Sequence, residues 1–244
     1  VICSFQSGGG IVETIRAIKD ESELDAIMKA QQIADLGFCH MLDYLKPGLT
    51  EKEAAFELEM FLRSHGADAL SFDTILVSGV RTSLPHGTPS PKILEKGDFI
   101  TMDFGCAVDG YRSDMTRTVA LGSISAEQRN VYDIVMRAQT AGCNAIRSGL
   151  SCREADRVCR DYIADEGLGV FFGHGTGHGV GLEVHEAPTL NTKSDEILKE
   201  NMVITVEPGI YMPKKFGVRI EDLAIVTASG IINLVKSDKE LIIL

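Results

Sequence analysis

The sequence has few basic residues relative to acidic ones, and it contains no apolar run long enough to cross a bilayer. Its 24 lysines and arginines stand against 35 aspartates and glutamates, so the formal net charge is −11. Such a negative chain is repelled by nucleic acid and by anionic membrane surfaces. We therefore expect a globular protein whose partner is neither nucleic acid nor a membrane.

Cysteine is present, but not in the patterns of a metal site or of a disulfide framework. The six cysteines form no C-x-x-C pair and show no regular spacing, which disfavours a thiolate metal site and a disulfide framework. The start of the chain shows no secretory signal pattern. Reduced thiols in a cytoplasmic protein are the expectation that follows.

The first ten residues, VICSFQSGGG, read as a linker or as a remnant foreign to the domain (1–10). The remaining length suits one large domain or two small ones, with a substantial core. The first strong helix is predicted to begin near Asp20, because the apolar residues from Leu24 to Leu45 keep helical spacing.

Glycine and histidine are concentrated in one stretch, FFGHGTGHGVGLEVHEAP, which contains His174, His178 and His185. Two histidines four residues apart are typical of zinc-peptidase helices. A helix is excluded here, because each interior glycine costs about 1 kcal/mol. The stretch instead predicts a loop that enters a strand at Val180, where apolar and polar residues begin to alternate. Its glycines would let other groups approach the backbone closely.

The two halves of the chain repeat a signal for paired helices. LKPGLTEKEA (45–54) matches IRSGLSCREA (146–155). Each segment has a glycine that suits a helix end, followed by Thr or Ser three residues before Glu, which is a capping box. Each half is therefore predicted to contain two consecutive helices joined by a short turn.

The halves also repeat a signal for strands that end in a carboxylate. ILEKGDFITMDFG (93–105) matches ILKENMVITVEPG (197–209) without a gap, and Asp103 falls opposite Glu207. A second carboxylate follows on a later strand of each half, Asp114 in YRSDMTRTVAL and Glu221 in GVRIEDLAIV. Equivalent carboxylates would meet if the halves pack about a pseudo-twofold axis.

A third match completes the repeat, since His86 and His185 both begin H-x-x-P segments. Three matches in the same order predict an internal duplication. We expect an α+β fold of two helix–helix–strand units, with a curved, mainly antiparallel sheet and helices outside.

Four converging carboxylates require positive charge. Each desolvated carboxylate costs several kcal/mol and repels the others. One solution is a salt bridge, for which Arg112, Arg117 and Arg219 are available. The other solution is a pair of divalent cations. Oxygen ligands with one imidazole suit manganese, cobalt, iron or zinc. Paired metal ions activate water in hydrolases, so the second solution predicts a hydrolytic site.

MDFG with SDMTRT, HGTGHGVGLEVHEAP, VEPGIY and GVRIED together resemble the pita-bread metallopeptidases, and among them the Xaa-Pro aminopeptidases and Xaa-Pro dipeptidases (prolidases). The resemblance runs from Ile11 to Val226. It implies the pita-bread fold, with residues 11–244 as the metallopeptidase catalytic domain. It also implies a metal-dependent exopeptidase that cleaves between an N-terminal residue and a penultimate proline in short peptides.

The resemblance further implies a ligand set for two divalent metal ions. The ligands would be Asp103, Asp114, His178, Glu207 and Glu221. Asp114 and Glu221 would bridge the ions, Asp103 would belong to one ion, and His178 and Glu207 to the other. Manganese is the ion we expect, with cobalt, zinc or iron as alternatives.

The same resemblance assigns roles to groups around the metals. Glu207 would be the general base. His86, His174 and His185 would surround the bound peptide and the tetrahedral intermediate. Arg219 would pair with an active-site carboxylate or with the substrate. Supporting positions beside the ligands are Thr116 and Arg117.

The sequence departs from the family pattern at its beginning. Proline-specific members usually carry an N-terminal domain before this one, and that domain helps them to oligomerise. This chain begins just before the first helix, so we expect the N-terminal domain to be absent here. The sequence leaves open whether the protein forms a homodimer.

Two alternatives share the fold. A methionine aminopeptidase would have the same five ligands, but such enzymes usually place the metal histidine first in their G-H-G segment. Here His174 precedes His178 by four residues, as in Xaa-Pro peptidases. A non-catalytic peptide-binding module is the second alternative, and the presence of every expected ligand disfavours it.

Overall fold

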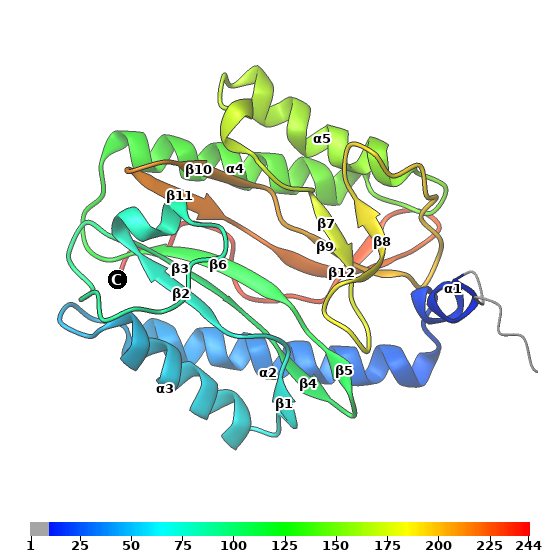
Figure 1. The fold of residues 1–244 in the computed structure, drawn as a ribbon, viewed down its shortest axis with the longest axis horizontal. Coiled ribbons are helices and arrows are strands. Elements are labelled where there is room, and N and C mark those ends of the chain that lie inside the picture. Colours follow the sequence, from blue (N-terminus) through cyan, green and yellow to red (C-terminus); the bar gives the residue numbers. More distant parts are fainter. Residues whose placement is uncertain (1–9) are drawn as a thin grey trace, which may run out of the picture.

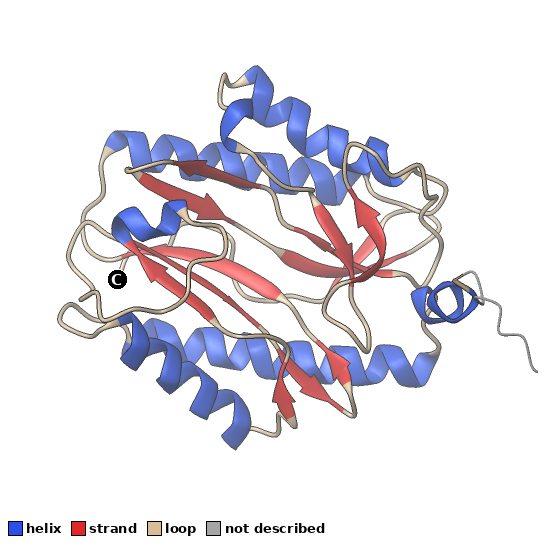
Figure 2. Cartoon of the chain, in the orientation of Figure 1, coloured by secondary structure: helices blue, strands red, loops and turns tan. Residues whose placement is uncertain are grey.

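Two pairs of helices enclose the strands, as Figure 1 and Figure 2 show. The computed structural model describes residues 10–244, so nearly all of the segment read as a linker (1–10), with Cys3, lies outside the described residues. No helix within this range is long and apolar enough to cross a membrane. The helices are α1 (Ile11–Ala17), α2 (Glu21–Tyr44), α3 (Glu51–Ser64), α4 (Ala126–Ala145) and α5 (Cys152–Asp165), with 3-10 turns at Gly79–Ser83 and Gly169–Phe171.

The second helix of each pair begins where its capping signal predicts, and α2 begins at the predicted position near Asp20. Asp20 caps α2, and its side chain accepts a hydrogen bond from the Glu23 backbone N–H at 3.0 Å. Reciprocal capping boxes open α3 at Thr50 and α5 at Ser151. Each box satisfies backbone donors that a helix start otherwise leaves unpaired, which confirms the two predicted helix pairs.

All pairings between named strands are antiparallel, but the curved sheet is divided into four hydrogen-bonded groups: β1-β4-β5, β2-β3-β6, β10-β11 and β13-β12-β9-β7-β8. The strands of the first half are β1 (Ala69–Leu70), β2 (Ile75–Ser78), β3 (Phe99–Phe104), β4 (Cys106–Val108), β5 (Tyr111–Arg112) and β6 (Met115–Ala120). Those of the second half are β7 (Gly177–Gly179), β8 (Glu186–Leu190), β9 (Val203–Val206), β10 (Gly209–Met212), β11 (Phe216–Arg219), β12 (Asp222–Val226) and β13 (Ile231–Asn233).

The duplication inferred from sequence is visible in the backbone pairing. An isolated bridge joins Thr50 to Ile93, and an equivalent bridge joins Ser151 to Ile197. Both pairs occupy matching positions in the two repeats. In each half, the residue that caps the second helix therefore pairs with the segment that leads into the equivalent strand.

The halves meet along β6 and the start of β12. Thr116 and Glu221 form an antiparallel bridge, with the Glu221 backbone N–H donating to the Thr116 carbonyl at 3.1 Å. The apolar core forms two clusters, and each takes residues from both halves. One cluster joins α2 and α3 to β2, β3 and β6 and includes Val203 and Leu223 of the second half, whereas the other joins α4 and α5 to β9, β10 and β11 and includes Phe99 and Ala120 of the first half. The strand ends at the seam are thus held between two packed layers (Figure 1).

Candidate metal centre and active site

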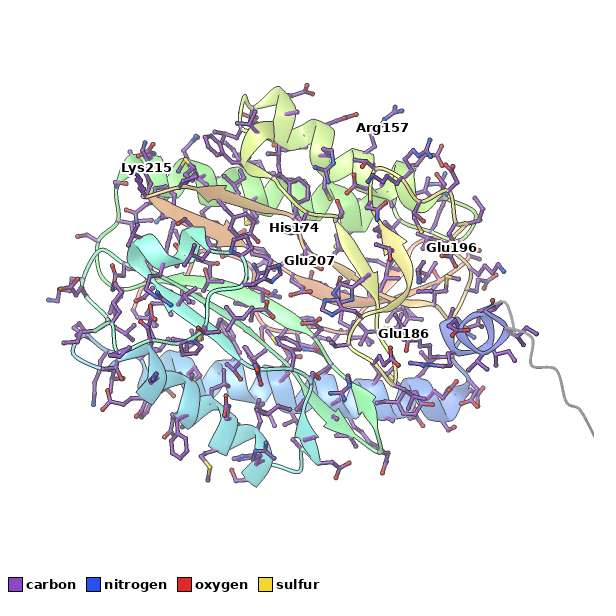
Figure 3. All side chains as sticks on the ribbon, viewed as in Figure 1. Arg157, His174, Glu186, Glu196, Glu207 and Lys215 are labelled. Atoms are coloured by element: carbon purple, nitrogen blue, oxygen red, sulfur yellow. The ribbon has the colours of Figure 1, made fainter. Side chains whose placement is uncertain are left out.

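One cavity of about 600 Å³ is lined by all nine residues predicted as metal ligands or catalytic groups, whereas the predicted supporting residues Thr116 and Arg117 lie outside its wall. Its carboxylates and one imidazole come from strands or strand ends: Asp103 in β3, Asp114 before β6, His178 in β7, Glu207 after β9 and Glu221 before β12. The other predicted residues in its wall are His86, His174, His185 and Arg219. Figure 3 shows His174 and Glu207 near the centre of the molecule, between the strands.

Three of these groups lie close enough to share one ion. Ligand atoms of Asp114, His178 and Glu221 all lie within 4.8 Å of one another. The His178 Nε2 atom is 3.2 Å from Glu207 Oε1 and 3.6 Å from Asp114 Oδ2. These side chains could hold a metal ion with oxygen ligands and one nitrogen ligand.

Hydrogen bonding orients His178 toward that position. Its Nδ1 atom lies 3.1 Å from the Gly179 carbonyl oxygen, which can only accept, so Nδ1 carries the proton. The Nε2 atom then faces the carboxylates, as a metal-binding imidazole does when its other nitrogen is held by a carbonyl. Burial alone would lower the pKa of His178, but the hydrogen bond and charge of Glu207 outweigh it and raise that pKa. The environment of Nε2 therefore favours a positive charge.

The carboxylates show the same demand for a cation. Burial raises the pKa values of Asp114 and Glu221 well above their usual range, and neighbouring carboxylates raise them further. Asp103 Oδ1 and Asp114 Oδ1 are buried without a hydrogen-bond partner among the described residues. Buried polar atoms of this kind require an explanation, and a cation supplies one. This donor set fits divalent metal ions.

Arg219 accounts for only part of the negative charge. Its guanidinium pairs with Asp103 Oδ2, donates to Thr116 Oγ1 at 3.0 Å and donates to the Tyr211 hydroxyl at 2.7 Å. Burial raises the pKa of Asp103 even though Arg219 opposes the rise. The salt-bridge solution thus serves one oxygen of one carboxylate, and the remaining acidic groups still require cations.

Tyr211 links Arg219 to His174, a connection that the sequence did not indicate. His174 Nδ1 lies 2.8 Å from the Gly175 carbonyl oxygen and therefore donates to it, so Nε2 accepts from the Tyr211 hydroxyl at 2.9 Å. Burial lowers the pKa of His174, which keeps the ring neutral at pH 7. The only available signal for Tyr211 was its place in the VEPGIY motif.

Two histidines lie at the mouth of the cavity. His86 and His185 are both exposed, and the His185 ring lies 4.2 Å from the His178 ring, centroid to centroid. Burial lowers the pKa of His185. The next residue, Glu186, accepts from Arg16 and from Lys19, each at 2.7 Å. These bonds anchor the segment that carries His185.

The glycine-rich stretch differs in one respect from its prediction. A strand was expected from Val180, but the strands are β7 (Gly177–Gly179) and β8 (Glu186–Leu190). Between them the Gly181 backbone N–H donates to the Glu183 carbonyl at 3.0 Å, which forms a tight turn and leaves Leu182 exposed. The prediction of strand alternation from Val180 is wrong, because this local turn interrupts the extended backbone.

The close approach expected of the glycines is present at Gly177. A Cβ atom there would lie 2.0 Å from the Thr205 carbonyl oxygen of β9, whereas a Cβ at exposed Gly173 would meet nothing within 4 Å. Gly177→Ala should lower the free energy of unfolding by about 1–3 kcal/mol, since it forces two strands apart. Gly173→Ala, the control, should change it by less than about 0.5 kcal/mol. Urea denaturation measures both, and equal effects would contradict the steric argument.

Comparison with known proteins identifies the family. Residues 25–228 match the model of metallopeptidase family M24. The chain belongs to this family. The M24 assignment supports divalent metal ions at the cluster of acidic groups around His178.

M24 relatives match the chain over nearly all of its length. It is 50% identical over 233 residues to "Uncharacterized peptidase YqhT" of Bacillus subtilis, covering 96% of this chain and 66% of that protein. It is 41% identical over 241 residues to a Xaa-Pro dipeptidase of Pyrococcus horikoshii, covering 99% of this chain and 69% of the relative. The chain thus spans about two thirds of the length of these relatives.

A solved M24 structure supports the fold. The Xaa-Pro dipeptidase from Bacillus anthracis superposes with a TM-score of 0.95 at 52% sequence identity, covering 96% of this chain and 66% of that one. The pita-bread fold implied by the sequence motifs is confirmed by this match.

Proposed function

We propose that this protein is a metal-dependent exopeptidase that cleaves the peptide bond between an N-terminal residue and a penultimate proline. The observation that carries the proposal is the convergence of five potential metal ligands and three histidines in one cavity. The names of relatives such as the Pyrococcus horikoshii Xaa-Pro dipeptidase support the choice of substrate class. Residues 11–244 form the catalytic domain in this proposal, and a homodimer is the assembly we propose for it.

The residues that would hold two divalent ions are Asp103, Asp114, His178, Glu207 and Glu221. When bound, the ions would activate a water molecule and polarise the scissile carbonyl. We propose manganese, with cobalt, zinc or iron as alternatives, because oxygen ligands with one imidazole suit these ions. Asp114, His178 and Glu221, whose ligand atoms lie within 4.8 Å of one another, would hold the ions together with Asp103 and Glu207.

The side chains around the metal ligands have separate roles in this proposal. Glu207, whose pKa is held at about 2 by His178 in spite of burial, stays ionised and takes the proton of the attacking water on a carboxylate oxygen. Arg219 fixes the orientation of Asp103 and Tyr211. His174 borders the reacting group, while His86 and His185 contact the peptide at the mouth of the cavity.

Proline in the second position suits this arrangement. A prolyl nitrogen has no N–H and its φ angle is fixed, so a site that recognises strand-like backbone hydrogen bonds loses a donor there. This cavity instead offers carboxylates, histidines and an apolar wall that includes Phe72, Ile75 and Pro85. The leaving prolyl nitrogen needs a proton, and the proton that Glu207 takes from the attacking water reaches it through one of the cavity histidines.

Two alternatives remain as outcomes of the test. A methionine aminopeptidase is disfavoured by the place of His174 in the cavity wall, next to Tyr211. A non-catalytic peptide-binding module is disfavoured by the complete set of ligands. The cytoplasm is the proposed location, and the five cysteines in the described part of the chain, all of them free, are consistent with it.

The test compares Ala-Pro, Ala-Pro-Ala, Ala-Ala-Ala and Met-Ala-Ser under identical loading with manganese, cobalt or zinc. We expect the proline peptides to be cleaved after alanine at least about tenfold faster than the others, a difference of about 1.4 kcal/mol. The ratio of Ala-Pro to Ala-Pro-Ala distinguishes a dipeptidase from an aminopeptidase. Preference for Met-Ala-Ser would establish the first alternative. No cleavage with metals bound would favour the binding module or a requirement for an additional domain.

A further inference from the structure

Helix α5 carries a buried ion pair on the side that faces the His174 segment. Asp156 is fully buried, and Arg160, one turn later, donates to both of its oxygens, from Nε at 2.8 Å and from Nη2 at 2.9 Å. Asp156 also accepts from the Thr176 backbone N–H at 2.9 Å and from its hydroxyl at 3.0 Å. Paired hydrogen bonds of this kind fix the plane of a guanidinium.

The oriented guanidinium of Arg160 reaches the backbone on both sides of Gly173. Its Nη1 donates to the Phe172 carbonyl at 3.1 Å, and its Nη2 donates to the His174 carbonyl at 2.6 Å. Its Cζ atom also lies 4.4 Å from the centroid of the Phe172 ring. That ring meets the His174 ring edge-on, with centroids 5.1 Å apart. Arg160 therefore holds His174 through its backbone and through its neighbouring ring.

The local sequence explains why such a clamp is needed. His174 stands between Gly173 and Gly175, and glycine gives a backbone more conformations than any other residue. The backbone on either side of His174 therefore does not fix the position of its side chain. The contacts of Asp156 and Arg160 restrict alternate residues of the segment, namely Phe172, His174 and Thr176.

We propose that Arg160, held in plane by Asp156, is a positioning residue that sets the place of the His174 ring in the cavity. It lies outside the cavity wall and acts only through the 172–176 segment. This inference rests on the proposed function for its kinetic effect, while its structural effect can be measured without any substrate.

The test replaces Arg160 by lysine, which keeps a positive charge beside the buried carboxylate but lacks the planar fork. Arg160→Gln, whose amide can still donate to Asp156, is made in parallel so that one unstable variant does not decide the result. Arg157→Lys is the matched control. Arg157 lies on the same helix, its side chain is 75% exposed, and its only ion pair is with Asp161 within the described residues. It lies at the outer edge of the molecule in Figure 3.

We expect the Arg160 variants to lower kcat on Ala-Pro-Ala by about 10- to 100-fold, the scale of a misplacement of about 1 Å in a reacting site. KM should stay within about twofold, because substrate affinity rests on other groups. Metal content and the circular dichroism spectrum should match those of the native protein, and Arg157→Lys should leave kcat unchanged. Native kcat in the folded Arg160 variants would overturn the proposal.

A second arm separates positioning from a general structural role. In a His174→Ala background, Arg160→Lys should lower kcat by no more than about twofold further, because residues that act through one group are not additive. A general loosening of the fold would instead multiply the two losses in full. That multiplication would overturn the proposal.

A third arm needs no catalysis. In protein labelled with ¹⁵N-histidine, the His174 resonances are assigned by their loss in His174→Ala. Arg160→Lys should shift or broaden them, and leave those of His40 and His65, on the α2 and α3 side, unchanged. If the native protein cleaves no peptide, the proposed function fails and this measurement alone decides the inference. Unmoved His174 resonances would overturn it.

Discussion

Replacing Glu221 by alanine should abolish metal binding and hydrolysis together. The carboxylate lies at the seam of the two halves, where Thr116 Oγ1 donates to its Oε2 at 2.6 Å, and its other oxygen remains for a cation. Loss of a residue that hydrogen-bonds to a metal ligand typically lowers metal affinity about 10- to 100-fold. Loss of a ligand itself should lower it further. Metal content measured after gel filtration, together with turnover of Ala-Pro-Ala, checks this result.

Glu196→Ala provides the matched control for that experiment. Glu196 is exposed and lies at the edge of the molecule, away from Glu207 at its centre (Figure 3). The control should keep native metal content and native turnover. Retention of full metal content by Glu221→Ala would remove Glu221 from the proposed ligand set.

Replacing His174 by alanine should separate chemistry from metal binding. The side chain contacts Tyr211, Gly175 and Phe172, and it borders the cavity without approaching the carboxylates as His178 does. The rate should fall by about 10²–10⁴, the scale for a positioned acid–base or stabilising group. The metal content should remain that of the native protein.

His65→Ala is the control for His174, since His65 is an exposed histidine just after α3. It should leave both the rate and the metal content unchanged. If His174→Ala lost metal as completely as Glu221→Ala, the division between ligands and substrate-contacting histidines would be wrong.

The features that the sequence predicted well depend on local signals repeated in each half. Capping boxes at Thr50 and Ser151 are short-range, since the partners lie three residues apart. The alignment of Asp103 with Glu207 needed only the repeat itself. The repeat placed equivalent strand ends together, so the convergence of the carboxylates could be expected before any distance was known.

The features that were missed depend on contacts between distant segments. Tyr211 reaches Arg219 because β10 and β11 pair in a register that sets Tyr211 opposite Gly217. Strand β7 consists of Gly177, His178 and Gly179, which have little strand preference of their own. It forms because β8 and β9 flank it. No local pattern contains this information.

The two halves of the duplicated fold differ at the position of His178, the imidazole among the proposed metal ligands. The His178 backbone N–H donates to the Thr205 hydroxyl of β9, and the equivalent position of the first half, opposite Thr101 of β3, is held by buried Val77. Among the proposed ligands, the second half thus offers a nitrogen donor and the first half only oxygen. The two proposed ions would face donors of different softness, so we expect their affinities to differ.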